Sequence, residues 1–426
     1  MEGQIYSLRL AKAMFLLVMA LCFQGCHEQF SGSLFKGNYP HERYQEQLDQ
    51  AGLEQSVMYR QWVDAARRGL DQPVSVTVPY QENAYMTAAF PSVAGYLFSA
   101  QEGERLQVLV STQSVDSVAV FVDLFAFSDD TTKQHRHLIS AEQGDSVLSW
   151  DVRNDGQYLL RIQPELMAEV SYDLRLTADP SLANPVDSEA KQHIGSVFGV
   201  PRDGGARRHE GIDIFAEKLT PVVAASSGLI TRVGTNRLGG KVVWLRPNDR
   251  DHRINLYYAH LDSQMVEPGQ VVSIGDTLGL MGNTGNAITT PPHLHFGVYG
   301  SDGAVDPMPF VQPGKSDPKA ITGNMERLGD SVRIATNMPA LVEALSNEGY
   351  RVRLVDGESR LVTSREVSQM NTIRTTRLEQ ETMVYAQPDT SAARITSLPS
   401  GESARVLGEY GSFILIDAPQ RGWIAK

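Results

Sequence analysis

Cysteine is nearly absent from this chain, whose 426 residues contain only Cys22 and Cys26. Cys22 lies inside an apolar run near the N-terminus, so the rest of the chain has no pair of thiols for an internal disulfide. A thiol enzyme is also excluded, because no cysteine follows residue 26. The stability of the protein must therefore come from packed cores and from any metal that it binds.

Positive charge is also scarce, since 38 Lys and Arg residues face 50 Asp and Glu residues and give a formal net charge of −12. Nucleic-acid binding proteins neutralise phosphates with a basic surface, so we expect no nucleic-acid partner. The 42% hydrophobic and 21% charged residues are typical of globular proteins. At roughly 150 residues per domain, the length predicts about three domains, each with its own core.

The N-terminal apolar run, residues 13–23, has only eleven residues. That is too short for a helix that crosses a bilayer core of about 30 Å. Arg9 and Lys12 precede the run, and Gly25 and Cys26 follow it. A positive segment, a short apolar segment and a small residue in this order indicate an export signal.

This arrangement resembles a bacterial lipoprotein signal over residues 1–26, which implies that Cys26 becomes the lipidated first residue of the mature chain. Phe23 departs from the Leu that the family prefers three positions before the cysteine, so ordinary cleavage and an uncleaved anchor remain alternatives. We expect export to the bacterial cell envelope and a membrane anchor on Cys26. His27, in place of Asp, is compatible with the outer membrane if the cell is Gram-negative.

The hydrophobic period changes after the first 72 residues. Leu53, Val57 and Trp62 belong to a set spaced by three and four residues, which predicts helix between Pro40 and Leu70 and a helical neck over residues 27–72. From Val74 to Leu176 the apolar residues alternate in six sets. This pattern predicts strands and an antiparallel β-sandwich over residues 73–178.

Two clusters of turn-forming residues, 178–188 and 313–318, divide the rest of the chain. Between them, residues 190–312 are rich in glycine and β-branched residues, so we expect a β-sheet domain there. Residues 376–426 resemble a bacterial SH3-like module, a small barrel. Residues 320–370 share its outline, and whether they form a degenerate second copy stays open. The predicted fold class is therefore mostly β and multidomain.

Ten histidines are present, and six of them lie in polar or turn-like surroundings. We expect four of the six at the solvated surface and find no specific signal at the other two: His27, His41, His135 and His137, then His193 and His252. The remaining four also lie in the glycine-rich region. They are His209, His260, His293 and His295.

His293 and His295 lie in a strictly alternating run, His293 to Tyr299. In a strand, both imidazoles would lie on one face, roughly 6 to 7 Å apart, while Leu294 and Phe296 would face the other side. That separation suits one metal ligand and one neighbouring acid or base. An isolated pair of this kind is more often two ordinary, partly buried histidines.

His209 and Asp213 supply further candidate ligands. Gly211 and the run that follows it favour an extended chain over a helix. In a straight strand the two side chains would be about 13 Å apart, so a shared ion requires a bend near Gly211. The pattern also departs from HExxH, which disfavours the helical metalloprotease site. Alone, a pair of this kind is more often a surface ion pair.

The motifs around His209, His260 and His293 indicate one function far more specifically together than alone. They occur in one order along the chain, and the stretch ends at Val305 to Pro309. The order resembles the lysostaphin-like (M23, LytM-type) zinc endopeptidases, which cleave the peptide part of bacterial peptidoglycan. The resemblance covers roughly residues 194–311. It implies zinc ligation by His209, Asp213 and His295 and a catalytic pair formed by His260 and His293.

The residue types suit this chemistry. Three nitrogen or oxygen ligands and an open position are typical of catalytic zinc, which lowers the pKa of its bound water to about 7. His260 and His293 are suited to proton transfer and to hydrogen bonding with an oxyanion, and the sequence leaves their division of labour open. We therefore expect a zinc endopeptidase that acts on peptidoglycan peptides.

Two alternatives belong to other classes. Some relatives of this family lose the zinc site and activate a separate cell-wall amidase, so a catalytically silent regulator is the second hypothesis. The intact set of five residues argues against it. A carrier domain of the biotinyl or lipoyl kind could share the glycine-rich hairpins, but the chain lacks a lysine-bearing turn. The oligomeric state stays open.

Overall fold

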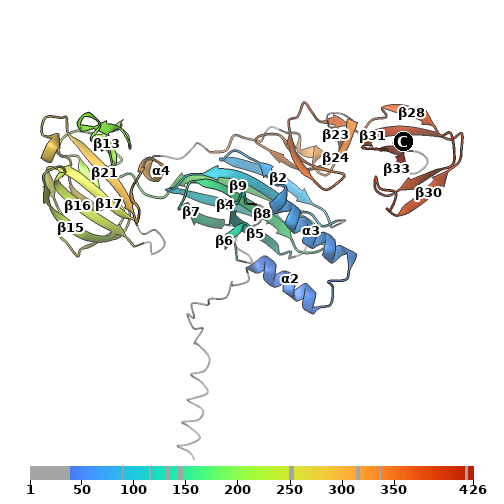
Figure 1. Ribbon diagram of the computed structural model, residues 1–426, viewed down its shortest axis with the longest axis horizontal. Helices are drawn as coiled ribbons and strands as arrows, with labels where there is room; N and C mark the ends of the chain where they lie inside the picture. The colour runs from blue at the N-terminus through green and yellow to red at the C-terminus, as the bar shows by residue number, and fades with distance from the viewer. Residues whose placement is uncertain are drawn as a thin grey trace, which may run out of the picture.

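The structure is a computed structural model that describes residues 39–426, apart from residues 89, 115–116, 131–133, 143–146, 249–253, 313–316, 322, 335–336 and 418–420. The predicted signal with Cys26 and the first part of the predicted neck lie outside the described residues. Figure 1 shows the β-rich parts in a row, with residues 193–311 at one end, the sandwich in the middle and the last sheet at the other end. The predicted mostly β, multidomain fold class is confirmed.

Two helices occupy the predicted neck, α2 (Pro40–Gln50) and α3 (Val57–Asp71). Gly52, with a φ of 74°, lies in the turn between them, and the Ser56 side chain caps α3 by accepting the Tyr59 N–H at 3.2 Å. Trp62 of α3 is buried, and its indole N–H donates to Pro164 O at 2.9 Å. The helices are therefore packed on the sandwich and are not a free spacer.

His41 of α2 is buried, so the prediction that it lies at the solvated surface is wrong. Its ring stacks on Trp62 with centroids 4.6 Å apart, and its Nε2–H donates to Gln163 Oε1 at 2.7 Å. The polar sequence around His41 gave no sign that this helix would lie against a sheet. Burial lowers the pKa of His41 to about 4.

The sandwich core lies between two sheets. The smaller sheet has the order β1-β3-β8-β5-β6, and the larger has the order β26-β25-β24-β2-β9-β4-β7. The strands up to residue 180 are β1 (Val74–Ser75), β2 (Tyr80–Met86), β3 (Ala94–Ala100), β4 (Glu104–Gln113), β5 (Val120–Ala126), β6 (Arg136–Ser140), β7 (Val147–Asp151), β8 (Gly156–Pro164) and β9 (Val170–Pro180). The sequence did not reveal β2, because its buried positions include Glu82 as well as apolar residues.

The larger sheet continues into residues 331–369. Strand β2 pairs with β24 in antiparallel register, with Glu82 opposite Ser346. The elements of this region are η3 (Met325–Arg327), β23 (Ser331–Ile334), β24 (Met338–Ser346), β25 (Tyr350–Leu354), β26 (Ser359–Val362) and β27 (Ser368–Gln369). The segment that could have been a second SH3-like copy thus extends the sheet of the sandwich.

A buried cluster of charges lies at this junction. The Arg351 guanidinium donates to Glu82 Oε1 at 3.1 Å and to Glu343 Oε2 at 2.7 Å, and all three side chains are almost fully buried. Glu82 also accepts hydrogen bonds from Tyr80 at 2.7 Å and from Tyr172 at 3.0 Å. Arg353 pairs with Glu343 Oε1 at 2.9 Å, so each carboxylate oxygen has a partner, as burial of charge requires.

The glycine-rich region forms an eight-stranded sheet with the order β10-β13-β21-β17-β16-β15-β19 and β22 paired to β21. These strands are β10 (His193–Ser196), β13 (Ile212–Phe215), β15 (Gly228–Asn236), β16 (Gly240–Pro247), β17 (Asn255–Leu261), β19 (Val271–Val272), β21 (His293–Gly300) and β22 (Gly303–Val305). A hairpin and a three-stranded sheet accompany it: β11 (Pro201–Arg202) with β12 (Arg207–Arg208), and β14 (Pro221–Val223), β20 (Thr277–Leu280) and β18 (Ser263–Gln264). Short helices are η1 (Asp203–Gly205), η2 (Gly285–Ala287) and α4 (Met308–Val311).

The chain enters and leaves this region at one place. The N–H of Leu182, just after β9, donates to the carbonyl of Phe310 in α4 at 2.9 Å. Phe310 is fully buried, and the space beside Gly103 of the sandwich is filled by its ring. The two connections therefore lie side by side.

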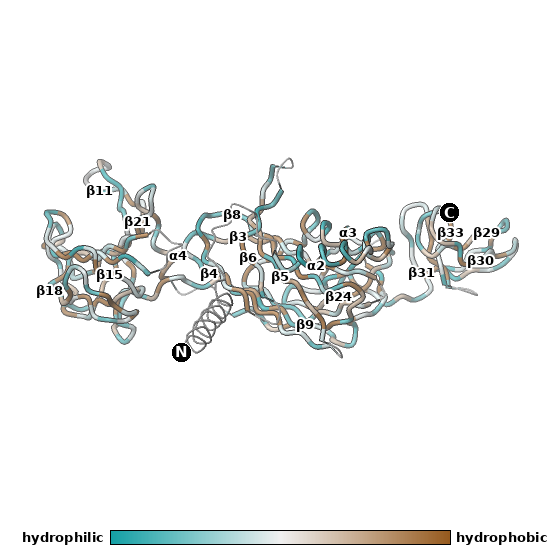
Figure 2. Tube along the Cα trace, turned by 90° about the horizontal axis from the view of Figure 1, so that it is seen from below, coloured by the Kyte–Doolittle hydropathy of each residue, from teal (hydrophilic) through white to brown (hydrophobic). Residues whose placement is uncertain are grey.

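The C-terminal residues form a six-stranded antiparallel sheet with its own core, in the order β28-β31-β32-β33-β29-β30. Its strands are β28 (Arg374–Arg377), β29 (Thr382–Tyr385), β30 (Arg394–Leu398), β31 (Ser403–Tyr410), β32 (Phe413–Asp417) and β33 (Arg421–Ala425). The SH3-like assignment of this sheet stays a prediction. Figure 2 shows the same row of parts from another side, with hydrophobic stretches along many strands. Within the described residues, no helix is long and apolar enough to cross a membrane.

Replacing Arg351 should destabilise the junction between β2 and β24. In Arg351→Leu, two buried carboxylates lose the guanidinium that they share, which costs about 3–5 kcal/mol. The matched control is Arg360→Leu, which breaks an exposed pair with Glu358 and should cost less than about 1 kcal/mol. Hydrogen exchange at the amides of β2 and β24 measures both effects, and equal costs would contradict the proposed role of the cluster.

His41 should make the stability of the sandwich depend on pH. Its folded-state pKa of about 4 lies below the unfolded value of 6.5, so the unfolded chain takes up the proton first as the pH falls. The free energy of unfolding therefore falls as the pH drops from 6.5 towards 4. Between pH 7 and pH 4.5 the loss should be about 2 kcal/mol. Urea unfolding followed by tryptophan fluorescence should show this loss in the wild type and not in His41→Gln. The same loss in both proteins would show that His41 is not its source.

Candidate metal centre

Asp213 and His295 face each other across two paired strands. Strands β13 and β21 are antiparallel, and their register places Asp213 directly opposite His295. Ile212, Ile214 and Leu294 are buried in the core below the sheet. Because side chains alternate along a strand, Asp213 and His295 lie on the other face, where His293 also lines the cleft.

His209 reaches the same place through a bend at Gly211. A Cβ atom at residue 211 would lie 2.4 Å from the carbonyl oxygen of Phe296, so only glycine allows the chain to pass this close to β21. The bend places His209 Nε2 only 3.0 Å from Asp213 Oδ1. The bend that a shared ion requires is therefore present.

Three donor atoms from these residues converge on one point. His209 Nε2 lies 2.9 Å from His295 Nδ1, and His295 Nδ1 lies 3.1 Å from Asp213 Oδ1. Ligand atoms at 2.0–2.2 Å from a tetrahedral zinc ion lie roughly 3.3 Å apart. Two imidazole nitrogens and one carboxylate oxygen at these separations fit zinc. They form a group of potential ligands within the described residues.

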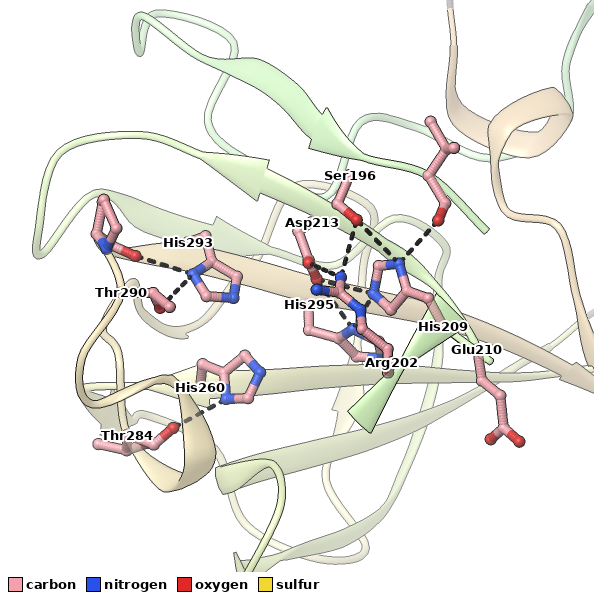
Figure 3. A network of polar contacts seen from close by, with 12 residues as sticks. Ser196, Arg202, His209, Glu210, Asp213, His260, Thr284, Thr290, His293 and His295 are labelled. Carbon is pink, nitrogen blue, oxygen red and sulfur yellow. Dashed lines mark hydrogen bonds and ion pairs between the residues drawn. The ribbon is translucent and has the colours of Figure 1, made fainter. Parts of the chain in front are cut away.

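Neighbouring groups orient these ligands. The Nδ1–H of His209 donates to Val197 O at 2.9 Å, which leaves the Nε2 lone pair for a metal. Arg202, on the hairpin, donates to Asp213 Oδ2 at 2.6 Å, the oxygen that is turned away from the two histidines (Figure 3). Arg202 was not predicted from the sequence, because no motif or spacing distinguishes it from the arginines nearby.

His260 reaches the cleft through a β-bulge. Strict alternation would place it on the buried face with Leu256 and Tyr258, but the register between β16 and β17 shifts before residue 261, and His260 has a φ of 63°. A bulge of this kind turns a side chain to the other face of the sheet. The Nδ1–H of His260 donates to Thr284 O at 2.8 Å, which fixes the ring.

His293 lies opposite His260, with ring centroids 4.9 Å apart. Its Nδ1–H donates to Pro291 O at 2.9 Å. In both rings the proton on Nδ1 leaves a lone pair on Nε2. Figure 3 shows the two rings together on one side of the three candidate ligands. The structure thus brings all five predicted site residues into one cleft.

Burial and neighbouring charges keep this site in a reactive protonation state. Burial, reinforced by His293, lowers the pKa of His260 to about 4, and burial also lowers the pKa of His295. Burial alone would raise the pKa of Asp213, but its close contacts with the His209 and His295 imidazoles outweigh burial and hold this pKa well below its usual range. Near pH 7, His260 and His295 are therefore neutral and the carboxylate of Asp213 is ionised.

The five residues line a cleft of about 880 Å³. One wall is aromatic: the Trp244 ring lies 4.6 Å from Tyr257 and 5.2 Å from Tyr299. The Tyr257 ring meets His295 edge to face at 5.9 Å, so the wall begins at a candidate ligand. The sequence analysis did not identify this wall. The cross-strand pairing of Trp244 with Tyr257, which needs the strand register, was the signal that could have found it.

Comparisons with known proteins agree with the site. Residues 207–307 match the model of peptidase family M23. Over 143 residues the chain is 37% identical to the L-Ala–D-Glu endopeptidase of Bacillus subtilis, a match that covers 30% of this chain and 43% of that protein. Lysostaphin of Staphylococcus staphylolyticus is 40% identical over 109 residues, 24% of this chain and 22% of that protein.

A third relative is the uncharacterized lipoprotein YgeR of Escherichia coli, 35% identical over 118 residues, 28% of this chain and 43% of that protein. The chain thus spans less than half the length of each of these relatives. The matched range of 207–307 contains all five residues that the sequence singled out. The part of the chain that carries them is similar to peptidase family M23.

Proposed function

We propose that this protein is a zinc endopeptidase that hydrolyses the peptide cross-links of bacterial peptidoglycan. The observation that carries the proposal is the convergence of three metal-binding donors and two further histidines in one cleft of an M23 domain. The names of two relatives, an L-Ala–D-Glu endopeptidase and lysostaphin, support it. The residues needed for catalysis are intact, which disfavours the catalytically silent regulator.

His209, Asp213 and His295 would hold the zinc ion through Nε2, Oδ1 and Nδ1. When bound, zinc supplies a Lewis acid for the peptide carbonyl and an acidified water molecule. The contact between His209 Nδ1 and Val197 O keeps the ligand ring in the required tautomer.

His260 and His293 would move the protons of the reaction. Hydrolysis breaks the C–N bond, adds the hydroxyl of water to the carbonyl carbon and transfers a proton to the leaving amine. A neutral Nε2 in each ring can take up a proton from water, and the resulting N–H can pass it on or donate to the developing oxyanion. Both rings are held by backbone carbonyls, so their orientation costs little on substrate binding.

We also propose that a lipid on Cys26 anchors the enzyme to a membrane of the bacterial envelope. The support is the signal-like sequence of residues 1–26 and the lipoprotein name of one relative. Several acyl chains on one residue hold a protein at a membrane durably, whereas a single chain does not. The anchor would hold the M23 domain near the wall that it acts on.

Loss of the metal and loss of a proton-transfer group should both abolish cleavage, with different effects on zinc content. We expect the purified protein to convert cross-linked dimers of peptidoglycan fragments to monomers, detected by mass spectrometry. His295→Ala should lose both zinc and activity, because a ligand is missing. His260→Ala should keep its zinc and lose activity by about 10²–10⁴-fold.

The control for this assay is the zinc-loaded wild type treated with a chelator and then given zinc again. Activity should disappear and return. Dimers left intact by a protein that contains one zinc per chain would contradict the enzyme proposal and favour the regulator. Loss of zinc from His260→Ala would instead place His260 among the ligands.

Replacing Cys26 should release the protein from the membrane. In Cys26→Ser the site of lipidation is gone, so the protein should move from the membrane fraction to the soluble fraction and lose incorporation of labelled palmitate. Cys22→Ser, the only other cysteine variant, should behave as the wild type. Palmitate incorporation in Cys26→Ser would refute the assignment of this site.

A further inference from the structure

Arg202 contacts the one oxygen of Asp213 that does not face the candidate ligands. Asp213 Oδ1 lies 3.0 Å from His209 Nε2 and 3.1 Å from His295 Nδ1. Asp213 Oδ2 accepts a hydrogen bond from Arg202 Nη2 at 2.6 Å. The carboxylate is thus divided: one oxygen points to the metal position and the other is held by a guanidinium.

The segment that carries Arg202 is tied to the metal centre in several ways. Arg202 Nη2 also donates to Ser196 Oγ at 2.8 Å, and Ser196 Oγ lies 3.4 Å from His209 Nδ1. The backbone N–H of Gly199 donates to His209 O at 2.8 Å, and the N–H of His209 donates to Val200 O at 2.9 Å. One loop, residues 196–202, therefore supports two of the three candidate ligands.

A carboxylate can bind a metal through one oxygen or through both. Ligation by both oxygens of Asp213 would add a fourth protein contact to the zinc ion and take up space at the position that a catalytic site keeps open for water. An ion pair on Oδ2 opposes this change, because the guanidinium offers that oxygen a directed, charge-assisted hydrogen bond. Only 8% of the Asp213 side chain is exposed, so little water competes for Oδ2.

We propose that Arg202 is a positioning residue that restricts Asp213 to one-oxygen ligation and so builds a tight zinc site with an open position. The inference concerns the metal site on which the proposed function rests. Its tests measure metal binding and geometry, so they can fail or succeed whether or not the protein cleaves peptidoglycan.

The direction of the change in zinc affinity distinguishes an arginine that positions Asp213 from one that only repels the ion. A guanidinium near a divalent ion repels it, so an arginine that merely occupied the site would weaken zinc binding, and its removal would tighten zinc binding. An arginine that orients a ligand strengthens zinc binding, and its removal weakens zinc binding. Loss of such an outer contact typically lowers metal affinity by about 10- to 100-fold.

The experiment measures zinc affinity by competition with a chromophoric chelator in the purified protein. Arg202→Gln should weaken binding by about 10- to 100-fold. Arg202→Lys keeps the charge but has a shorter side chain without the planar guanidinium, so its zinc affinity should lie between those of the wild type and Arg202→Gln. Arg208→Gln, an exposed arginine of the same hairpin, is the matched control and should bind as the wild type. Equal or tighter binding in Arg202→Gln would overturn the inference.

Cobalt substitution gives a second readout that does not depend on activity. Four-coordinate cobalt(II) absorbs visible light more strongly than five-coordinate cobalt(II). The wild type should therefore show a strong band that weakens in Arg202→Gln as the second oxygen of Asp213 binds. Circular dichroism checks that the variant is folded, and an unchanged cobalt band in the folded variant would contradict one-oxygen control by Arg202.

Discussion

One antiparallel pairing, that of β13 with β21, sets the geometry on which the site depends. Below the sheet, Ile212, Ile214 and Phe296 are at most 2% exposed, and burial of each such side chain is worth about 1.5–3 kcal/mol. Above the sheet, the same register places Asp213 opposite His295. A slip by one residue would bury the polar set and expose the apolar one, so the core holds the ligands in register.

The features of the site that could be predicted from the sequence depend on residues close together in the chain. The alternation around His293 and the need for a bend at Gly211 followed from local rules, and both are present in the structure. The role of His260 was inferred from the resemblance of the sequence to a peptidase family, because alternation alone would have placed this side chain in the core. The bulge and the positive φ that turn it outwards depend on pairing between strands, which local patterns do not contain.

The burial of His41 and of Glu82 escaped prediction for one cause, which is contact between residues far apart in the chain. His41 contacts Gln163, and Glu82 contacts Arg351. Polar residues such as these look solvent-exposed in the sequence, because nothing local shows that a partner will accompany them into the interior. The same holds for β2, whose inward-facing Glu82 breaks the apolar alternation of a strand.

The hydrogen bond between Leu182 and Phe310 has a consequence for how the chain assembles. Strands β2 and β24 pair although residues 193–311 lie between them in the sequence. Joining them directly would require closing a very long loop, and the entropic penalty of closure grows with the length of the flexible segment. Because the two ends of residues 193–311 meet, the folding of this region shortens that loop to its two flanks. Early folding of residues 193–311 would thus speed completion of the sheet that contains β2 and β24.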